Sequence, residues 1–593
     1  MLSINTQKIN QLALFSLIVI AVVYAPMLSV WLQSGIEGAF GYFAADAFYY
    51  LSVADHSVGK SFYTFDGQFP TNGFHPLWQY YLCISFELFK IQAAESQVLF
   101  TFFSSILFVA IGTGLFGLAL NRITKNLAVT LISLVPGLFG ILFAHISLEG
   151  TSPNNQWSFI NGMETPLSIL FFGVLTYFLI CKKYLVQVSL KKVAVVSLLL
   201  TLITLSRLDD IFMFAPFFLL LFILSDNRKT ILKNLVAFAV IPFLLIGTYI
   251  LYNLSYAGVA LPTSGIAKAG LTYRNLKLLV GLFIPKLQFV AIGTDFWGEL
   301  RYRLLQMSVP MFLSVAWVGR QILTFRSENK SKAANSVSRT GIRDYFLKND
   351  FRYNMMIITA FSIYVFLKGA YNFLNVHVWG QGHWYFALSL MICNMIMALF
   401  LSKIFEAVKI KHKFVRLGVI AFAMTYIVLL ANDFTDIKMK DSYRKNKRLE
   451  FWLARNDVMQ NVGEIINGYG LLSFDDGIIS YSLKGIPTMN GLGLALDKEA
   501  FEHIQKGNLF RIAYQRGFRF FTGLYSFDIP KEADTNPEVL KTDRFVGWYH
   551  LDQYRKQWDF SVAYRHPETN VAFVEFKPAQ SLSEPLTNGS LTN

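Results

Sequence analysis

The sequence predicts an all-α polytopic membrane protein that carries a water-soluble α/β or α+β domain at its C-terminal end. Of its 593 residues, 54% are hydrophobic and only 15% are charged, whereas soluble domains carry about 25% charged residues. Apolar runs of about 17–25 residues, which is bilayer-spanning length, recur between residues 11 and 432. Mixed polar sequence follows over residues 433–580, and residues 581–593 have the composition of a disordered tail.

About eleven spans are expected in the membrane domain, residues 1–432. The first run is too long for a signal-peptide core and lacks a small-residue cleavage site, which favours a retained span. The fifth and sixth spans are short and meet at Ser206 and Arg207, so a re-entrant pair is the alternative. The expected spans are 11–32, 97–120, 127–147, 165–181, 193–206, 208–224, 231–252, 304–320, 353–372, 384–402 and 414–432.

The formal net charge of +15 is explained by membrane topology, because the basic residues concentrate in short loops between spans. This bias argues for contact with anionic lipid and against a nucleic-acid partner. The three cysteines are far apart, which argues against a disulfide framework or a metal cluster. Because successive spans cross the membrane in alternate directions, the segments between the basic loops are expected on the extracytoplasmic side, together with the C-terminal domain. These segments are 33–96, 148–164, 253–303, 373–383 and the chain after 433.

The C-terminal domain shows both helical and strand patterns. LEFWLARNDVMQNVGEII and KEAFEHIQKGNLFRIAYQRG predict two amphipathic helices, and YGLLSF and FRFFTGLYSF predict two buried strands. DFSVAYR and NVAFVEFKP, joined by HPET, predict a hairpin.

The segment after the first span, residues 46–78, predicts a functional site. Acids at a membrane surface are costly to desolvate, and this segment carries three aspartates. In DAFYYLSVAD, the side chains of Asp46, Tyr49 and Tyr50 share one helical face, whereas Asp55 falls on the opposite face. Asp46 is therefore the candidate functional acid, and the alternative is that it only caps an interfacial helix.

The second half of this loop, TFDGQFPTNGFHPLW, is rich in turn residues and puts Asp66 in a tight turn. Backbone amides freed by such turns, together with Asn72 and His75, could bind hydroxyl groups or a phosphate. We expect the TNGFHPLW portion to shape the floor of a pocket.

Charged residues lie in or beside apolar segments at two further places in the sequence. Glu164 lies at the start of the fourth span, where it is either a second active-site acid or a partner of the helix dipole. Arg207, Asp209 and Asp210 lie in an otherwise apolar stretch, where they either pair with one another or hold an anionic substrate group.

Two weaker signals complete the set on the outer face. A loop of small residues, YNLSYAGVALPTSGIAKAG, ends at Lys268 and suits a phosphate. An interfacial aromatic belt accounts for Trp384 and Tyr385, but it leaves His383 as a substrate-contact candidate.

The motifs D-A-F-Y-Y, F-D-G, T-N-G-F-H-P-L-W, G-M-E-T, S-R-L-D, Y-N…P-x-S-G…K and H-W-Y-F follow one another along the chain. In this order they resemble a bacterial branch of the polytopic GT-C glycosyltransferases. That superfamily includes lipid A aminoarabinose transferases, protein mannosyltransferases and mycobacterial arabinofuranosyltransferases. The resemblance implies a bacterial inner-membrane enzyme that takes a sugar from a polyprenyl-phosphate donor and transfers it, with inversion, on the extracytoplasmic face. The implied acceptor is a cell-envelope glycan, lipopolysaccharide or protein.

Carried over by motif, Asp46 would be the catalytic base and Glu164 a second catalytic acid, while Arg207 and Lys268 would hold the donor phosphate. Many relatives have an acidic doublet where this chain has Ala45 and Asp46, so no metal ligand is assigned, and Mg²⁺ or Mn²⁺ stays open as a cofactor. The expected substrate pocket comprises Tyr49, Tyr50, Asn72, His75, Asp209, His383, Trp384 and Tyr385.

The main alternative function is a lipid or sugar transporter or flippase. It predicts polar residues through the depth of the spans and helices broken at mid-membrane. The charges of this sequence cluster at one face instead, which favours the enzyme.

Overall fold

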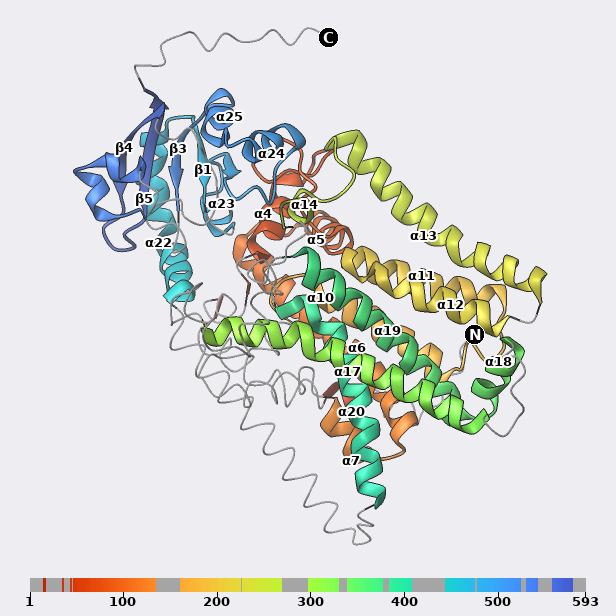
Figure 1. Cartoon of the computed structure of the whole chain (residues 1–593). Helices are drawn as coiled ribbons and strands as arrows, with labels where there is room; N and C mark the ends of the chain where they lie inside the picture. The colour runs from red at the N-terminus through yellow and green to blue at the C-terminus, as the bar shows by residue number, and fades with distance from the viewer. Residues whose placement is uncertain are drawn as a thin grey trace, which may run out of the picture.

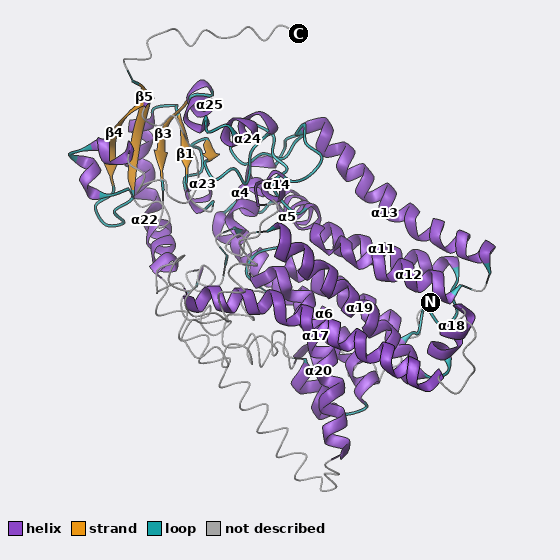
Figure 2. Ribbon diagram, in the orientation of Figure 1, coloured by secondary structure: helices purple, strands orange, loops and turns teal. Residues whose placement is uncertain are grey.

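The structure, a computed structural model, is mostly helical, with one small sheet in the C-terminal part of the chain (Figures 1 and 2). It describes residues 14–17, 35–36, 43–44, 46–134, 160–225, 227–268, 297–329, 339–376, 383–407, 443–474, 477–523, 529–541 and 557–579.

The helices of the predicted membrane domain run at varied angles to one another and pack around a common apolar core (Figure 1). They are α4 (Ala47–Ser57), α5 (Pro76–Leu88), α6 (Ala94–Thr124), α7 (Leu127–Ser133), α10 (Thr165–Thr176), α11 (Leu190–Ser206), α12 (Phe214–Leu224), α13 (Arg228–Tyr256), α14 (Thr263–Lys268), α17 (Trp297–Asn329), α18 (Arg339–Leu347), α19 (Asp350–Asn375) and α20 (Ala387–Ala407).

Three of the described helices, α6, α13 and α19, are long and apolar enough to cross a membrane. Only 11% of the apolar window of α13 is buried inside the protein, so its exposed leucines and phenylalanines suit contact with lipid. These helices make the chain a membrane protein. The predicted count of eleven spans is not confirmed, because 414–432 and nearly all of 11–32 lie outside the described residues.

Two glycines let α6 and α10 pack backbone to backbone. A Cβ atom added at Gly173 would lie 2.1 Å from the carbonyl oxygen of Gly112, and one added at Gly112 would lie 2.6 Å from the carbonyl oxygen of Ile169. Small residues at such crossings are what allow membrane helices to approach closely. This contact helps to fix the position of α10, whose N-cap residue is Glu164.

The C-terminal sheet has the strand order β2-β1-β3-β5-β4, with β2, β1 and β3 parallel and β5 antiparallel to both β3 and β4. The predicted strands β1 and β3 and the predicted β4–β5 hairpin are confirmed. The sequence reasoning missed β2, which is only three residues long. The elements are α22 (Tyr443–Ile466), β1 (Gly470–Ser473), α23 (Ile478–Ser482), β2 (Thr488–Asn490), α24 (Lys498–Gln505), α25 (Leu509–Gln515), β3 (Phe518–Thr522), β4 (Trp558–Arg565) and β5 (Ala572–Pro578).

One helix prediction in this domain is wrong. KEAFEHIQKGNLFRIAYQRG forms two helices, α24 and α25, instead of one. The chain breaks at Gly507, whose φ of +72° lies in the left-handed region that ends helices. The break lets Phe501 and Phe510 both reach the core beneath the sheet.

The sheet domain packs directly on α4, the helix that follows Asp46. Lys484 forms an ion pair with Asp55 at 2.8 Å, and the Asn490 side-chain amide donates to the Tyr49 hydroxyl at 3.0 Å. The backbone at Gly477 lies so close to α4 that an added Cβ would be 2.8 Å from the Tyr49 nitrogen. Because of these contacts, α4 is held between the helical bundle and the sheet.

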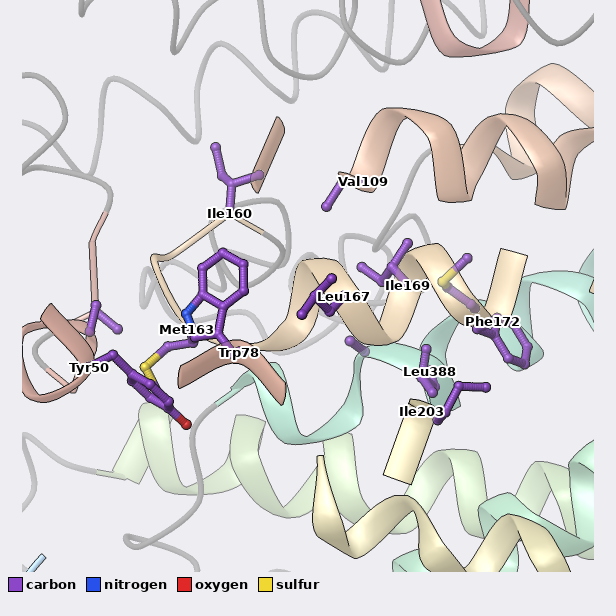
Figure 3. Packing of buried hydrophobic residues seen from close by; sticks show 14 of the residues in the cluster. Tyr50, Trp78, Val109, Ile160, Met163, Leu167, Ile169, Phe172, Ile203 and Leu388 are labelled. Carbon is purple, nitrogen blue, oxygen red and sulfur yellow. The ribbon is translucent and has the colours of Figure 1, made fainter. Parts of the chain in front are cut away.

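The apolar core reaches the start of α10 (Figure 3). Trp78 and Met163 lie beside Tyr50 there, and the Trp78 indole donates to the Gly162 carbonyl at 3.0 Å. The chain at the start of α10 is thus held in place by apolar packing as well as by hydrogen bonds.

We expect Gly173→Ala to destabilise the protein by about 1–3 kcal/mol, because the new methyl group must push α6 and α10 apart. Thermal unfolding of the purified protein in detergent would measure the loss. Gly247→Ala is the matched control, because nothing lies within 4 Å of its added Cβ and alanine is the better helix former. Equal melting temperatures for the two variants would contradict the close packing.

Candidate active site

A cavity of about 610 Å³ lies where α4, α13, α19 and the sheet domain meet. Its wall combines charged and polar side chains with apolar ones. The charged and polar residues include Asp46, Tyr49, Tyr50, His75, Glu164, Arg207, Asp209, Tyr371, Asn372 and Tyr385. Segments far apart in sequence, from the first loop to the segment after β2, therefore converge on one site.

Asp46 directly precedes the first residue of α4 and lines the cavity. It occupies the N-cap position, but its side chain makes no capping hydrogen bond to the helix. The N-cap position agrees with the capping alternative, whereas the missing side-chain bond does not. Tyr49 and Tyr50, one turn further along the same face, line the cavity beside it, as the helical spacing predicts.

The loop after α4 is organised by Asp66 and Asn72. The Asp66 carboxylate accepts from the backbone nitrogens of Gln68 and Phe69 at 2.8 and 2.7 Å, which forms the predicted tight turn. Burial raises the pKa of Asp66 above its ordinary value, against the opposing effect of these hydrogen bonds.

Asn72 lies behind the cavity wall instead of in it. Its amide donates to the carbonyls of Val259 and Leu261, both at 3.1 Å, and its oxygen accepts from the Thr263 nitrogen at 3.2 Å. Asn72 thus fixes the first loop to the segment that leads into α14. Its neighbours Gly73 and His75 do line the cavity.

His75 joins the first loop to the segment after α11. Its Nδ1 accepts from the Leu208 backbone nitrogen at 3.3 Å, and this bond leaves the proton of a neutral ring on Nε2. Nε2 lies 3.7 Å from Glu164 Oε1. The ring is therefore oriented with its N–H group toward the buried acid.

Glu164 is fully buried and accepts from two directions. The Tyr50 hydroxyl donates to Oε2 at 3.0 Å, and the Arg207 guanidinium donates to Oε1. Burial raises the pKa of Tyr50 well above its ordinary value, so the phenol keeps the proton that it donates. Although Glu164 is the N-cap residue of α10, its side chain makes no cap hydrogen bond.

Arg207 has extended backbone between α11 and the 3₁₀ helix Leu208–Met213. Its guanidinium is flanked by Glu164 and by Asp209, whose Oδ1 lies 2.8 Å from Nε. The guanidinium also lies over the Tyr385 ring, 3.8 Å from the ring centroid. The predicted residues Arg207, Asp209, Glu164 and Tyr385 are thus brought together.

Lys368 of α19 completes this charged cluster and, like the cavity residues Tyr371 and Asn372, was missed by the sequence reasoning. Its ammonium donates to Asp210 and lies 3.4 Å from Asp209 Oδ2, while the Tyr364 hydroxyl also donates to Asp210. A lone lysine inside a predicted span was the available signal, because such a charge is costly unless it is paired.

Three predicted residues cannot be placed at the level of side chains. Lys268 ends α14, and His383 and Trp384 belong to the 3₁₀ turn His383–Phe386, but their side chains lie outside the described part. The preceding α14 residues Ser264 and Gly265 do line the cavity. Within the described ranges, no group of three or more His, Cys, Asp or Glu side chains could hold a metal ion.

Comparison with known proteins gave matches among solved structures only. No family model matches the chain, and no curated protein matches it. The archaeal oligosaccharyltransferase AglB from Archaeoglobus fulgidus, in complex with an inhibitory peptide and a dolichol-phosphate, is similar at 14% identity and a TM-score of 0.47, over 98% of this chain and 75% of that chain. ArnT from Cupriavidus metallidurans, bound to undecaprenyl phosphate, is similar at 13% identity and a TM-score of 0.42, over 94% of this chain and 97% of that chain. Since both TM-scores are below 0.5, the function proposed below depends on the geometry and the motifs.

The buried cluster predicts a large effect of removing one partner. Lys368→Met should destabilise the protein by about 3–5 kcal/mol, because Asp210 would stay buried without its cation. Unfolding of the purified protein in detergent would measure the loss. Lys183→Met, which breaks an exposed ion pair with Asp350, is the matched control and should cost about 0–1 kcal/mol.

The pairing itself is tested by adding Asp210→Asn to Lys368→Met. The double variant should recover part of the lost stability, because the uncompensated charge is removed. Strictly additive losses would show that Lys368 and Asp210 do not depend on each other.

Proposed function

We propose that this chain is an inverting glycosyltransferase that takes a sugar from a polyprenyl-phosphate donor and transfers it to an acceptor of the cell envelope. The observation that carries the proposal is the amphiphilic cavity. It is lined both by charged side chains, such as Arg207 and Asp46, and by apolar ones, such as Ile246 and Ile250 of α13. An amphiphile with a phosphate head and a hydrocarbon tail matches this mixed lining.

The helix α13, which supplies these two isoleucines, also faces outward. Phe243 is 78% exposed and Leu251 is 67% exposed, both on α13. A donor lipid could therefore lie along α13 in the bilayer while its phosphate enters the cavity. Arg207 and Lys268 would then hold the phosphate, as the motifs imply.

The chemistry needs a base and a cation, but no covalent nucleophile. Asp46 takes the proton of the acceptor hydroxyl while that oxygen attacks the anomeric carbon from the face opposite the phosphate. The bond between the anomeric carbon and the phosphate oxygen breaks, and the electron pair leaves with the polyprenyl phosphate. Arg207 and Lys268 stabilise the negative charge that develops on the phosphate.

Glu164 is proposed to position Arg207, because both of its carboxylate oxygens already accept hydrogen bonds. Its contacts with Tyr50 and Arg207 fix the guanidinium at the cavity wall. Within the described ranges, no donor set fits Mg²⁺ or Mn²⁺, so no step is routed through a metal ion.

The acceptor side is proposed to be formed by the C-terminal domain, residues 433–580. Leu494 and Ala495, in the loop after β2, line the cavity on the side of the sheet. With the C-terminal domain extracytoplasmic and the protein in a bacterial inner membrane, the acceptor would be a glycan, lipopolysaccharide or protein that enters past this loop.

Replacing Asp46 by Asn should lower transfer by about a hundredfold or more, because the base that accepts the hydroxyl proton is lost. The measurement is turnover of purified protein with polyprenyl-phosphate-linked sugars and candidate envelope acceptors. Asp55→Asn is the matched control on the same helix; it loses the ion pair with Lys484 but should keep its turnover. Near-normal turnover of folded Asp46→Asn would disprove the base assignment.

Replacing Lys268 by Gln should weaken donor binding by about tenfold or more and leave acceptor binding nearly unchanged, because a charged contact to the phosphate is lost. Isothermal titration with a polyprenyl phosphate would measure the donor affinity. Lys506→Gln, an exposed lysine in the sheet domain, controls for the change of charge. Donor affinity equal to that of the unmodified protein would contradict the phosphate assignment.

A further inference from the structure

A second cavity lies at the opposite end of the helices from the candidate active site. It has a volume of about 700 Å³, within the range of about 300–1,000 Å³ typical of small-molecule sites. On α19 it is lined by Phe351 and Met355, whereas Tyr371 of the same helix lines the first cavity. A rise of 1.5 Å per residue separates Met355 from Tyr371 by about 24 Å, so the two cavities are distinct sites near opposite bilayer surfaces.

The walls of this second cavity come from α17, α19 and α20 and are mainly apolar. Phe400 is 64% exposed and Phe351 is 53% exposed, so the cavity opens on the surface that these apolar helices present to lipid. We call it the lipid-facing groove; it is lined by Leu313, Ala316, Trp317, Arg320, Gln321, Thr324, Phe351, Met355, Ile396, Met397, Leu399, Phe400 and Lys403.

Two cations, Arg320 and Lys403, come from different helices to this groove. Neither forms an ion pair with any carboxylate that the structure describes. Each lies near an aromatic ring instead: Arg320 is 5.9 Å from the Trp317 centroid, and Lys403 is 5.5 Å from the Phe351 centroid. The nearby acid Asp350 is already paired with Lys183 and Arg122.

We propose that the lipid-facing groove binds an anionic glycerophospholipid of the adjacent leaflet, with its phosphate between Arg320 and Lys403. Charge complementarity supports this occupant, because a planar guanidinium and an ammonium recognise phosphate oxygens. The apolar walls, including Leu313 and Ile396, would cover the acyl chains. Basic pockets between membrane helices are a known way of binding anionic head groups.

The test uses the full-length protein in nanodiscs made of equal amounts of phosphatidylcholine and phosphatidylglycerol. Native mass spectrometry would count the lipids that stay bound to the protein after it is released from the nanodisc. We expect phosphatidylglycerol to be retained in preference to phosphatidylcholine. In Arg320→Gln/Lys403→Gln its affinity should fall about thirtyfold, because each basic residue near a membrane contributes about 1 kcal/mol.

Lys229→Gln/Lys233→Gln is the matched control, because it removes the same charge from exposed positions at the start of α13, outside the groove. It should retain phosphatidylglycerol as the unmodified protein does. Ala316→Trp is a second variant that fills the groove without changing the charge, so it should also lose the bound lipid.

Three results would overturn the proposal. The first is equal retention of the two lipids, and the second is undiminished phosphatidylglycerol binding in folded Ala316→Trp or Arg320→Gln/Lys403→Gln. The third is displacement of phosphatidylglycerol by low concentrations of undecaprenyl phosphate, which would make the groove a site for a polyprenyl lipid instead.

Discussion

The arrangement of the cavity depends on one buried network of charges. Glu164, Asp209 and Asp210 oppose Arg207 and Lys368, and these five side chains come from the start of α10, the segment after α11 and the second half of α19. Each ion is costly to remove from water unless a partner is in place. The helices must therefore adopt one relative position, and the apolar core around Trp78 and Met163 packs in agreement with it.

The network also explains why the first loop and the sheet domain close over the same helix. Tyr50 of α4 donates to Glu164, and His75 accepts from the segment beside Arg207. The sheet domain also contacts α4: Asn490 donates to Tyr49, and Lys484 pairs with Asp55 on the opposite face. Asp46, at the start of α4, lines the same cavity as the charged cluster and the loop after β2, and the proposed base must share a site with the groups that bind the substrates.

The sequence predicted the features that depend on local pattern. The face shared by Asp46, Tyr49 and Tyr50 follows from helical spacing, and the β4–β5 hairpin follows from alternation. Contacts between residues far apart in sequence could not be predicted. No local pattern indicates that Lys368 pairs with Asp210 or that Asn72 binds the first loop to residues 259–263. The break at Gly507 was missed although a glycine after a basic residue is a helix-stop signal, and β2 was missed because three residues are too few to show a period.

The pairing of Arg207 bears on how the proposed donor would bind. Its guanidinium already contacts Glu164 and Asp209, so a phosphate must share it or replace one of these acids. Glu164 can give up that contact at reduced cost, because Tyr50 already donates to its second oxygen and the Nε2 of His75 lies 3.7 Å from the first. Asp209 likewise retains Lys368. The neighbours of Arg207 thus supply the compensation that a buried carboxylate needs when its cation turns toward a ligand.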